Sequence, residues 1–362
     1  MRARSVATAL GVMLSVLAGC GFGASNAPSA PVDRARSGDS RACDRYASPI
    51  GRDSWPGTLR RPFRSVGRLQ LSLRPGRVAC LRRGSYSGDL TLRRGGRPGE
   101  RAVLRAHRNE RVTLAGRLWV ARGADDLLIS RLHLDGRNER RLPSPTVNAD
   151  RVSFKRVEVT NHHTGICFVL GSRQYGAAEG TRIEASRIHD CGRLPATNHD
   201  HGFYVEEASG TRIVGNWIYD NADRGVQLYP NAQGTVVTGN VITGNGSGVL
   251  MSGDHGLVSN DSRIEGNVIS QSVRRFNVES YYPPGNPVGK RNRVVRNCVF
   301  GGARGAQAGG VQVPATGFTL EANVIAKPAF ADPGAGDFRL RRPGRCRSVL
   351  GRWAGVIPGP RP

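Results

Sequence analysis

The sequence predicts an all-β protein built as a stacked β-solenoid. Short, β-branched phrases punctuated by Gly recur every 24 to 31 residues between Ser130 and Asn323, and apolar residues alternate within each phrase. A fixed period this short, without heptads, is typical of coils that stack on one another. The uninterrupted repeat also favours one elongated domain over two compact ones.

The repeats align on a turn position that Asn usually occupies. The series reads Ser130, Lys155, Ser186, Asn216, Asn240, Asn267, Asn297 and Asn323. In one repeat we expect strands over 211–215, 217–220 and 225–229, with Val226 and Leu228 pointing inward and Gln227 and Tyr229 outward. Stacked Asn side chains can hydrogen-bond one another and the backbone, so we assign this column a structural role.

The first twenty residues resemble a bacterial lipoprotein signal. Arg2 and Arg4 precede an apolar run over 6–17, and Leu17-Ala18-Gly19-Cys20 follows. The resemblance implies that Cys20 is lipidated and anchors an extracytoplasmic protein to the cell membrane. The alternative is an ordinary signal peptide with a Cys nearby. The apolar run is too short for a stable membrane span, and 21–42 has the composition of a flexible linker.

Six cysteines follow Cys20, namely Cys43, Cys80, Cys167, Cys191, Cys298 and Cys346. An even number in an exported chain predicts three disulfides. Because a solenoid keeps sequence neighbours close, we favour pairing along the chain: 43 with 80, 167 with 191 and 298 with 346. No CxxC spacing occurs, which argues against a zinc cluster.

The formal net charge of +25 comes almost wholly from arginine, and residues 31–122 alone contain 22 Arg and 7 acids. A GC-rich genome would explain Arg in place of Lys, but it would not explain the shortage of acids. A positive field favours anionic partners such as acidic polysaccharide, wall polymer, membrane headgroups or nucleic acid. Nucleic acid is the weakest of these, because export separates the protein from it and no aromatic stacking platform is visible.

The N-terminal third reads as a cap followed by the first coils. We expect an amphipathic helix over 61–73 that ends at Pro75-Gly76, then strands near 78–81, 84–86, 89–92, 102–105 and 111–114. A helical plug would cover the open strand edges and apolar side chains at the end of a solenoid.

These residues resemble the pectate-lyase-like superfamily, whose caps read as a helix, Pro-Gly-Asp, a strand and Gly-x-Tyr. Pro75-Gly76 and Gly84-Ser85-Tyr86 match, while Arg77 stands where Asp is usual. The resemblance covers 57–340 and implies a single-stranded right-handed parallel β-helix with a short N-terminal capping helix. The expected divisions are signal peptide 1–20, linker 21–42, cap and first coils 43–122, repeats 123–340 and a C-terminal cover 341–362 held by Cys346.

Titratable residues gather where three repeats meet. Aligning the third strands on Gly165, Gly202, Gly225 and Gly248 predicts four columns on one face: His163, Asp200 and Asp223; Thr164, His201 and Arg224; Cys167, Tyr204 and Gln227; Val169, Glu206, Tyr229 and Ser252. The segment 198–204 is the densest cluster, with His162, Asp254 and His255 on flanking turns. Any one of these residues alone would be expected to be a solvated turn residue. The functional prediction therefore concerns the group as a whole.

The chemistry that suits this group is attack on a uronic acid. The proton at C5 is removed once the neighbouring carboxylate is neutralised, a base is supplied and an acid completes the step. We expect Arg224 to neutralise, His199 or His201 to act as the base, and Tyr204 or Tyr229 to donate a proton. Donation to the leaving oxygen gives a lyase, and donation back to carbon gives an epimerase.

The remaining candidates have supporting roles. Asp200 or Asp223 could orient a histidine, or join Glu206 and Asp254 in binding Ca²⁺. We expect substrate contacts from His163, Glu206, Gln227, Asp254 and His255.

Two families with this fold bear on the reaction. The alginate C5-epimerases carry Asp-Pro-His-Asp/Glu, and Thr197-Asn198-His199-Asp200 resembles its second half. The paired-aspartate phrases of polygalacturonase-type glycosidases do not occur, so hydrolysis ranks below elimination. The sequence therefore predicts a lipid-anchored monomer that binds an acidic polysaccharide or cell-wall glycan as a lyase or C5-epimerase. The alternative is a non-catalytic glycan-binding surface protein.

Overall fold

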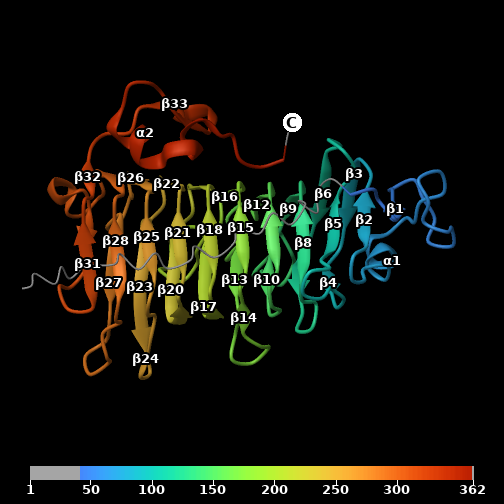
Figure 1. Ribbon diagram of the computed structural model, residues 1–362, viewed down its shortest axis with the longest axis horizontal. Coiled ribbons are helices and arrows are strands. Elements are labelled where there is room, and N and C mark those ends of the chain that lie inside the picture. The colour runs from blue at the N-terminus through green and yellow to red at the C-terminus, as the bar shows by residue number, and fades with distance from the viewer. Residues whose placement is uncertain (1–40, 361–362) are drawn as a thin grey trace, which may run out of the picture. The chain divides into compact units, whose positions relative to one another are not determined.

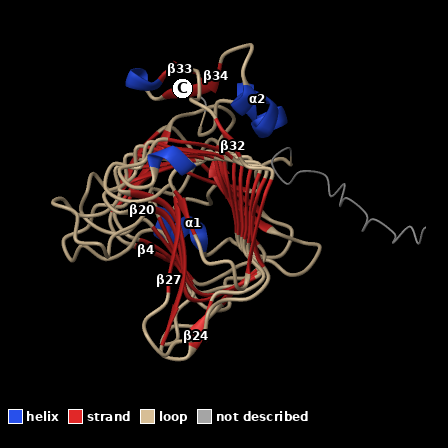
Figure 2. Ribbon diagram, turned by 90° about the vertical axis from the view of Figure 1, so that its left-hand side faces the viewer, coloured by secondary structure: helices blue, strands red, loops and turns tan. Residues whose placement is uncertain are grey.

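The computed structural model describes residues 41–360, which form a right-handed parallel β-helix (Figure 1). The expected signal peptide and nearly all of the expected linker lie outside these residues. Each coil contributes one strand to each of three parallel sheets, as in β18 (Arg212–Val214), β19 (Trp217–Tyr219) and β20 (Arg224–Gln233). Figure 2 looks along the stack. The all-β solenoid predicted from the repeats is confirmed.

The first sheet has 11 strands, in spatial order β1 (Arg45–Ala47), β2 (Val78–Leu81), β5 (Ala102–Ala106), β8 (Leu127–Ser130), β11 (Ser153–Lys155), β15 (Arg182–Glu184), β18 (Arg212–Val214), β21 (Val236–Thr238), β25 (Arg263–Glu265), β28 (Asn292–Val295) and β31 (Phe318–Glu321). The second has 10, namely β3 (Gly84–Ser87), β6 (Val112–Ala115), β9 (His133–Asp135), β12 (Glu158–Thr160), β16 (Arg187–His189), β19 (Trp217–Tyr219), β22 (Val241–Thr243), β26 (Val268–Ser270), β29 (Cys298–Phe300) and β32 (Val324–Ile325).

The third sheet, also of 11 strands, runs through β4 (Leu90–Leu92), β7 (Leu118–Val120), β10 (Thr146–Val147), β13 (Phe168–Leu170), β17 (Phe203–Ser209), β20 (Arg224–Gln233), β23 (Ser247–Asp254), β27 (Val278–Tyr281) and β30 (Val311–Gln312). The other two of its 11 strands are short and lie off this path: β14 (Ala178–Glu179) pairs with β17, and β24 (Leu257–Val258) is antiparallel to β23.

The core consists of apolar columns, one from each sheet, that run along the stack. In the first sheet Ile183, Ile213, Val237, Ile264 and Val294 stand in register, and each is fully buried. The third sheet repeats the pattern with Phe168, Phe203, Val226, Val249 and Val278, where the rings of Phe168 and Phe203 stack at 4.9 Å. Val226 and Leu228 point inward as predicted, because alternate residues of a strand face opposite sides.

A ladder of asparagines holds the coils in register at the turn between the first and second sheets. Each amide Nδ2 donates to the Oδ1 of the next coil's Asn, at 3.0 Å from Asn216 to Asn240 and 2.9 Å from Asn240 to Asn267. The ladder continues through Asn297 to Asn323, and the backbone N–H of Ser186 donates to Asn216. The predicted structural role of these asparagines is confirmed.

The two earliest members of the predicted Asn series were wrong by two residues. Lys155 pairs with Glu184, so buried Val157 is the residue aligned with Ser186, and Ser130 likewise precedes the ladder position. Neither coil carries the Asn that identifies this turn, and an apolar side chain fills the site instead.

The N-terminal cap contains a helix, but a shorter one than the amphipathic pattern predicts. α1 spans Val66–Gln70, with the Ser65 hydroxyl accepting from the Arg68 N–H at 3.0 Å and Val66 and Leu69 buried. Residues 61–64 are not helical, because the Phe63 N–H donates to the carbonyl of Tyr46 and so continues the edge of β1.

Three disulfides join Cys43 to Cys80, Cys167 to Cys191 and Cys298 to Cys346, as predicted. Such bonds persist in oxidising compartments, which places the protein outside the cytoplasm. Within residues 41–360, no helix has both the length and the apolar character needed to cross a membrane.

The C-terminal segment folds back over the outer face of the second sheet (Figure 2). Its elements are β33 (Phe330–Asp332), η2 (Pro333–Ala335), β34 (Asp337–Leu340), α2 (Arg345–Leu350) and η3 (Gly351–Gly355), while η1 (Ala306–Ala308) precedes them. Trp353 lies against Gly215 and Gly239, where any Cβ would come within 2.3 Å of its ring.

Candidate functional site

The candidate site lies on the outer face of the third sheet, where β17, β20 and β23 are its longest strands (Figure 1). One outward column reads Val169, Tyr204, Gln227, Leu250 and Glu279 along the stack. Arg224 pairs with Ser247 just before it, and Tyr229 and Ser252 lie two residues after it. Tyr204, Gln227 and the His201–Arg224 pair therefore share one face, as the sequence predicts.

The predicted register of the preceding coil was wrong by two residues. Val169, not Cys167, lies beside Tyr204. The predicted alignment of Val169 with Glu206 was therefore also wrong. Gly202 and Gly225 sit at a tight corner, where a Cβ on Gly202 would meet the Gly225 carbonyl at 2.8 Å. In the earlier coil this corner is held by buried Cys167, so aligning the strands on Gly165 misplaced them.

His201 is buried, with 2 % of its surface exposed, and this burial, together with the positive charge of Arg224 and nearby His199, holds its pKa well below the usual value. The backbone N–H of Arg224 donates to Nδ1 at 3.4 Å. A neutral ring that accepts at Nδ1 carries its proton on Nε2. His201 is thus a hydrogen-bond donor at Nε2 and does not suit the role of base. The ring meets Tyr204 edge-on at 5.9 Å.

Arg224 lies under a loop of residues 192–200. Its two terminal nitrogens donate to the backbone carbonyl and side-chain Oδ1 of Asn198, at 2.7 and 2.8 Å. Burial lowers the pKa of Arg224, and its Nε is buried without a hydrogen-bond partner among the described residues. The acceptor Oε1 of Gln227, three residues along the same strand, is likewise buried and unpartnered. Such atoms in native proteins commonly meet water or a ligand.

Asp200 and Asp223 hold this loop in place. Asp200 Oδ2 accepts from Arg193 Nε at 2.7 Å and from the Thr197 hydroxyl at 3.2 Å, while its own N–H donates to Asp223 Oδ2 at 3.0 Å. Both carboxylates therefore fasten the loop, and binding of Ca²⁺ by them stays a prediction. In residues 41–360 no group of three or more His, Cys, Asp or Glu side chains is arranged to hold a metal.

A second set of groups lies one step along the strands. The rings of Tyr204 and Tyr229 stack at 6.2 Å, and the Tyr229 hydroxyl donates to Asp254 Oδ2 at 3.1 Å. Burial raises the pKa of both phenols, and burial with the neighbouring Glu207 charge raises that of Glu206. Beside them, a hollow of about 400 Å³ is lined by Arg173, Glu207 and their neighbours.

The structure separates two predicted histidines from this face. His255 is at the tip of the hairpin between β23 and β24, and its side chain is 81 % exposed. His163 does not align with Asp200; its Nδ1 lies 3.1 Å from the Gly192 carbonyl and its Nε2 3.5 Å from Asp190. Asp200 and Asp223 are adjacent as predicted, but placing His163 in their column was wrong, because the coil of His163 is shifted by the same two residues.

His163 instead adjoins a charged network on the second sheet that sequence reasoning missed. Glu158 bridges His133 at 2.7 Å and His189 at 3.2 Å, and His189 Nδ1 lies 2.8 Å from Asp190. These hydrogen bonds hold the pKa of Glu158 far below normal. Burial opposes protonation of His189, yet its hydrogen bonds to Asp190 and Glu158 raise its pKa to about 9. Correct register at 133, 158 and 187 would have revealed the cluster.

Sequence reasoning also missed an aromatic pair at the start of the outward column. Trp119 leads to Tyr204 through Thr146 and Val169, and its ring meets Tyr175 edge-on at 5.6 Å. Its indole N–H donates to Asn148 Oδ1 at 2.8 Å. Sugars stack on such amphipathic rings, which supply a flat apolar face beside polar groups.

The model of the right-handed β-helix region matches residues 146–327, half of the chain. The chain belongs to the right-handed β-helix family. Among solved structures, this β-helix protein is similar to pectate lyase Pel9A, with 16 % identity, a TM-score of 0.59, and 84 % of this chain and 91 % of that chain covered. These similarities establish the fold alone.

Two further solved structures share the fold. XylC, solved with xylose, has 9 % identity and a TM-score of 0.55, covering 71 % of this chain and 69 % of that one. A glycoside hydrolase has 10 % identity and a TM-score of 0.53, covering 87 % and 99 %. No curated protein matches the sequence.

Proposed function

We propose that this β-helix protein binds a polysaccharide along the outer face of the third sheet and acts on its uronic acids as a lyase or C5-epimerase. The observation that carries the proposal is the adjacency of neutral, buried His201 to Arg224, beside Tyr204 and Gln227 on the next outward column. A pectate lyase among the structures of like fold adds support for a carbohydrate substrate.

The proposed roles follow from these positions. The positive charge of Arg224 and the Nε2–H of His201 stabilise the uronate carboxylate and so favour ionisation at C5. His199, exposed on the loop above, accepts the C5 proton, since His201 already carries a proton on Nε2. In elimination the C5–H and C4–O bonds break, a C4=C5 double bond forms, and Tyr204 protonates the leaving oxygen. In epimerisation Tyr204 returns a proton to the opposite face of C5.

Hydrolysis of a neutral polysaccharide is the second candidate. The observation that favours it is the pair of carboxyl groups beside Tyr229, one the raised-pKa Glu206 and the other Asp254. Glycosidases use two carboxyl groups on one face, one of them with a raised pKa, as acid and base. A binding role without turnover is the third outcome that the assay below must separate.

The test is incubation of the purified protein with pectate, alginate, glycosaminoglycans and xylan, with three readouts. Elimination produces ultraviolet absorbance of unsaturated uronate, epimerisation in D₂O places deuterium at C5 without chain cleavage, and hydrolysis releases reducing ends without absorbance. Absorbance or deuterium exchange supports the proposal. Reducing ends alone would move the assignment to hydrolysis, and binding without any of the three would establish a glycan-binding protein.

We also propose that Cys20 carries lipid, that 21–42 tethers the β-helix to the membrane and that the protein is a monomer. The three disulfides support export. Radiolabelled palmitate should be incorporated by the wild-type chain and lost in Cys20→Ser, which should leave the membrane fraction. Label retained in Cys20→Ser would contradict lipidation at this residue.

A further inference from the structure

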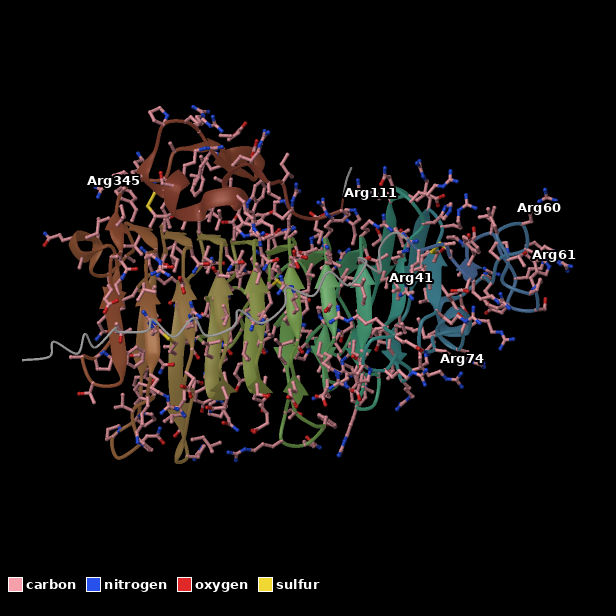
Figure 3. All side chains as sticks on the ribbon, in the orientation of Figure 1. Arg41, Arg60, Arg61, Arg74, Arg111 and Arg345 are labelled. Carbon is pink, nitrogen blue, oxygen red and sulfur yellow. A yellow bond between two sulfur atoms is a disulfide. The ribbon has the colours of Figure 1, made fainter. Side chains whose placement is uncertain are left out.

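The N-terminal end of the β-helix carries a concentrated positive charge. Residues 41–77, here termed the arginine cap, contain nine arginines and two acids. Figure 3 shows Arg60, Arg61 and Arg74 projecting around this end of the stack, and all three are exposed. Although Arg77 pairs with Asp44 and Arg41 donates to the Gly76 carbonyl, the positive charge of the cap exceeds what its two acids can neutralise.

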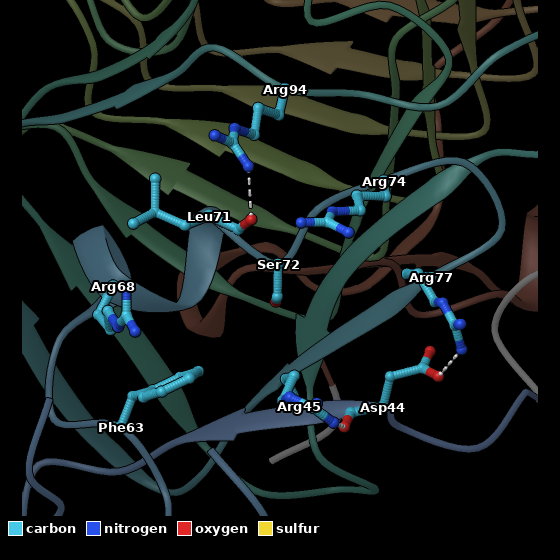
Figure 4. A pocket seen from close by; sticks show the side chains of 9 residues that line it. All are labelled: Asp44, Arg45, Phe63, Arg68, Leu71, Ser72, Arg74, Arg77 and Arg94. Atoms are coloured by element: carbon cyan, nitrogen blue, oxygen red, sulfur yellow. Dashed lines mark hydrogen bonds and ion pairs between the residues drawn. The ribbon is translucent and has the colours of Figure 1, made fainter. Parts of the chain in front are cut away.

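A hollow of about 520 Å³ opens in the cap and is lined by Arg45, Arg68, Arg74, Arg77 and Arg94 with only one acid, Asp44 (Figure 4). Asp44 is taken by Arg77 at 2.8 Å. Arg94 donates to the Leu71 carbonyl at 2.8 Å.

Two of these arginines, Arg68 and Arg74, make no ion pair with a described carboxylate, although the charge of Arg68 helps to lower the pKa of Asp53. Within residues 41–360 no carboxylate lies within 4.0 Å of the Arg68 or Arg74 guanidinium, although Arg68 packs over the Phe63 ring at 5.3 Å. Unpaired guanidinium groups around one hollow are suited to bidentate binding of phosphate oxygens.

Apolar side chains are exposed on the same cap. Ile50 is 89 % exposed, Leu59 45 % and Leu71 42 %, and Leu71 itself lines the arginine hollow. Half-buried Trp55 lies under Arg52 and Arg61, at 5.7 and 5.8 Å from its ring. Binding of a soluble polyanion would leave the Ile50 side chain in water. A lipid interface buries aliphatic side chains and indole rings while neighbouring arginines bind its phosphates.

We propose that the arginine cap docks on an anionic phospholipid surface, with Arg68 and Arg74 binding lipid phosphates and Ile50 entering the interface. The proposal goes beyond glycan binding and rests on the proposed lipid anchor only for bringing the cap close to the membrane. The chain from Cys20 to Arg41 spans 21 residues, so it can reach at most about 70 Å. Docking by the cap points the far end of the β-helix away from the bilayer.

The test measures co-sedimentation of the full chain carrying Cys20→Ser with vesicles of phosphatidylcholine, alone or with phosphatidylglycerol. This background removes the lipid, and because every variant keeps the same apolar run 6–17, differences between variants report on the cap. We expect tighter binding to the anionic vesicles that weakens with added salt. Arg68→Gln with Arg74→Gln should weaken that binding about 25-fold, about five-fold for each charge. The matched control, Arg212→Gln with Arg304→Gln, removes two exposed charges elsewhere and should change it less than two-fold.

Three results would overturn docking on lipid. Equal binding to neutral and anionic vesicles would mean that anionic phosphates are not bound. An equal loss of binding in the control pair would mean that net charge, not the position of Arg68 and Arg74, determines binding. Binding to soluble polyglycerol phosphate that depends on Arg68 and Arg74 but not on Ile50→Ser would instead assign the cap to a wall polymer. None of these assays contains a glycan substrate or lipidated Cys20. The test of membrane docking is therefore independent of the proposed enzyme activity and of the proposed lipid anchor.

Discussion

At the scale of single residues, His201 and Arg224 differ from solvated turn residues because both are buried. Arg224 Nε has no hydrogen-bond partner among the described residues. The backbone hydrogen bond to His201 Nδ1 leaves the ring proton on Nε2. Neither side chain belongs to the apolar columns. Titratable groups buried at a desolvation cost are typical of functional sites.

We therefore expect His201→Gln and Arg224→Gln each to lower kcat about 100-fold or more, as loss of a preorganised donor does. The free energy of unfolding should fall by only about 1 to 2 kcal/mol, chiefly because Arg224→Gln leaves Asn198 short of donors. The control is His162→Asn, a half-exposed position outside the site, which should leave kcat within two-fold. Activity per folded molecule that survives in both variants would make these residues structural.

His189 gives a prediction for pH. Its pKa is raised from 6.5 to about 9 in the folded protein, so the stabilisation is complete below pH 6.5 and is lost as the pH rises through 9. The shift corresponds to about 3 kcal/mol. Urea unfolding at pH 6 and pH 10 should show this fall in wild type, and His189→Gln should flatten it. An unchanged slope in the variant would assign the pH dependence to other groups.

At the scale of elements, the Asn ladder makes each coil's turn depend on the next. Asn240 donates to Asn267 and to the Ile213 carbonyl while accepting from Asn216, all in buried surroundings. Asn240→Ala leaves these groups without partners, and we expect a loss of about 1 to 3 kcal/mol. Denaturant midpoints measure it, with exposed Asn109→Ala as the control expected within about 0.5 kcal/mol. Similar midpoints for the two variants would mean that the ladder hydrogen bonds of Asn240 do not stabilise the fold.

The strands and disulfides could be predicted because each rests on local pattern: β-branched alternation, Gly at turns and cysteines kept near in space by stacking. Register in the coils before Ser186 could not, because Val157 and Cys167 replace the Asn and Gly that identify those turns. The same register error concealed the Trp119 site and the Glu158 network. Their members are far apart in the sequence and come together only when the coils are correctly aligned. His201's tautomer depended on one backbone hydrogen bond that no sequence pattern encodes.

At the scale of the whole molecule, stacking turns a short repeat into a long outward face, which we propose binds the polysaccharide. The outward column from Trp119 to Glu279 crosses six coil steps, a length of about 29 Å at the usual strand spacing. The proposed reacting groups lie near its middle, and Trp119 is three steps from Tyr204. A flexible polymer substrate can therefore gain affinity far from the bond that reacts.

This arrangement predicts that affinity rises with oligosaccharide length until the ligand covers the column, about 29 Å, and then levels off. Trp119→Ala should weaken long oligosaccharides about ten-fold, the value of one lost stacking contact, while short ones that reach only Tyr204 and Gln227 bind as in wild type. Calorimetric titration of a length series measures both effects, and the exposed, distant Arg212→Gln serves as the control. A uniform loss at every length would mean that Trp119 supports the fold of the face, since only a ligand that spans the coils can distinguish the two ends of the column.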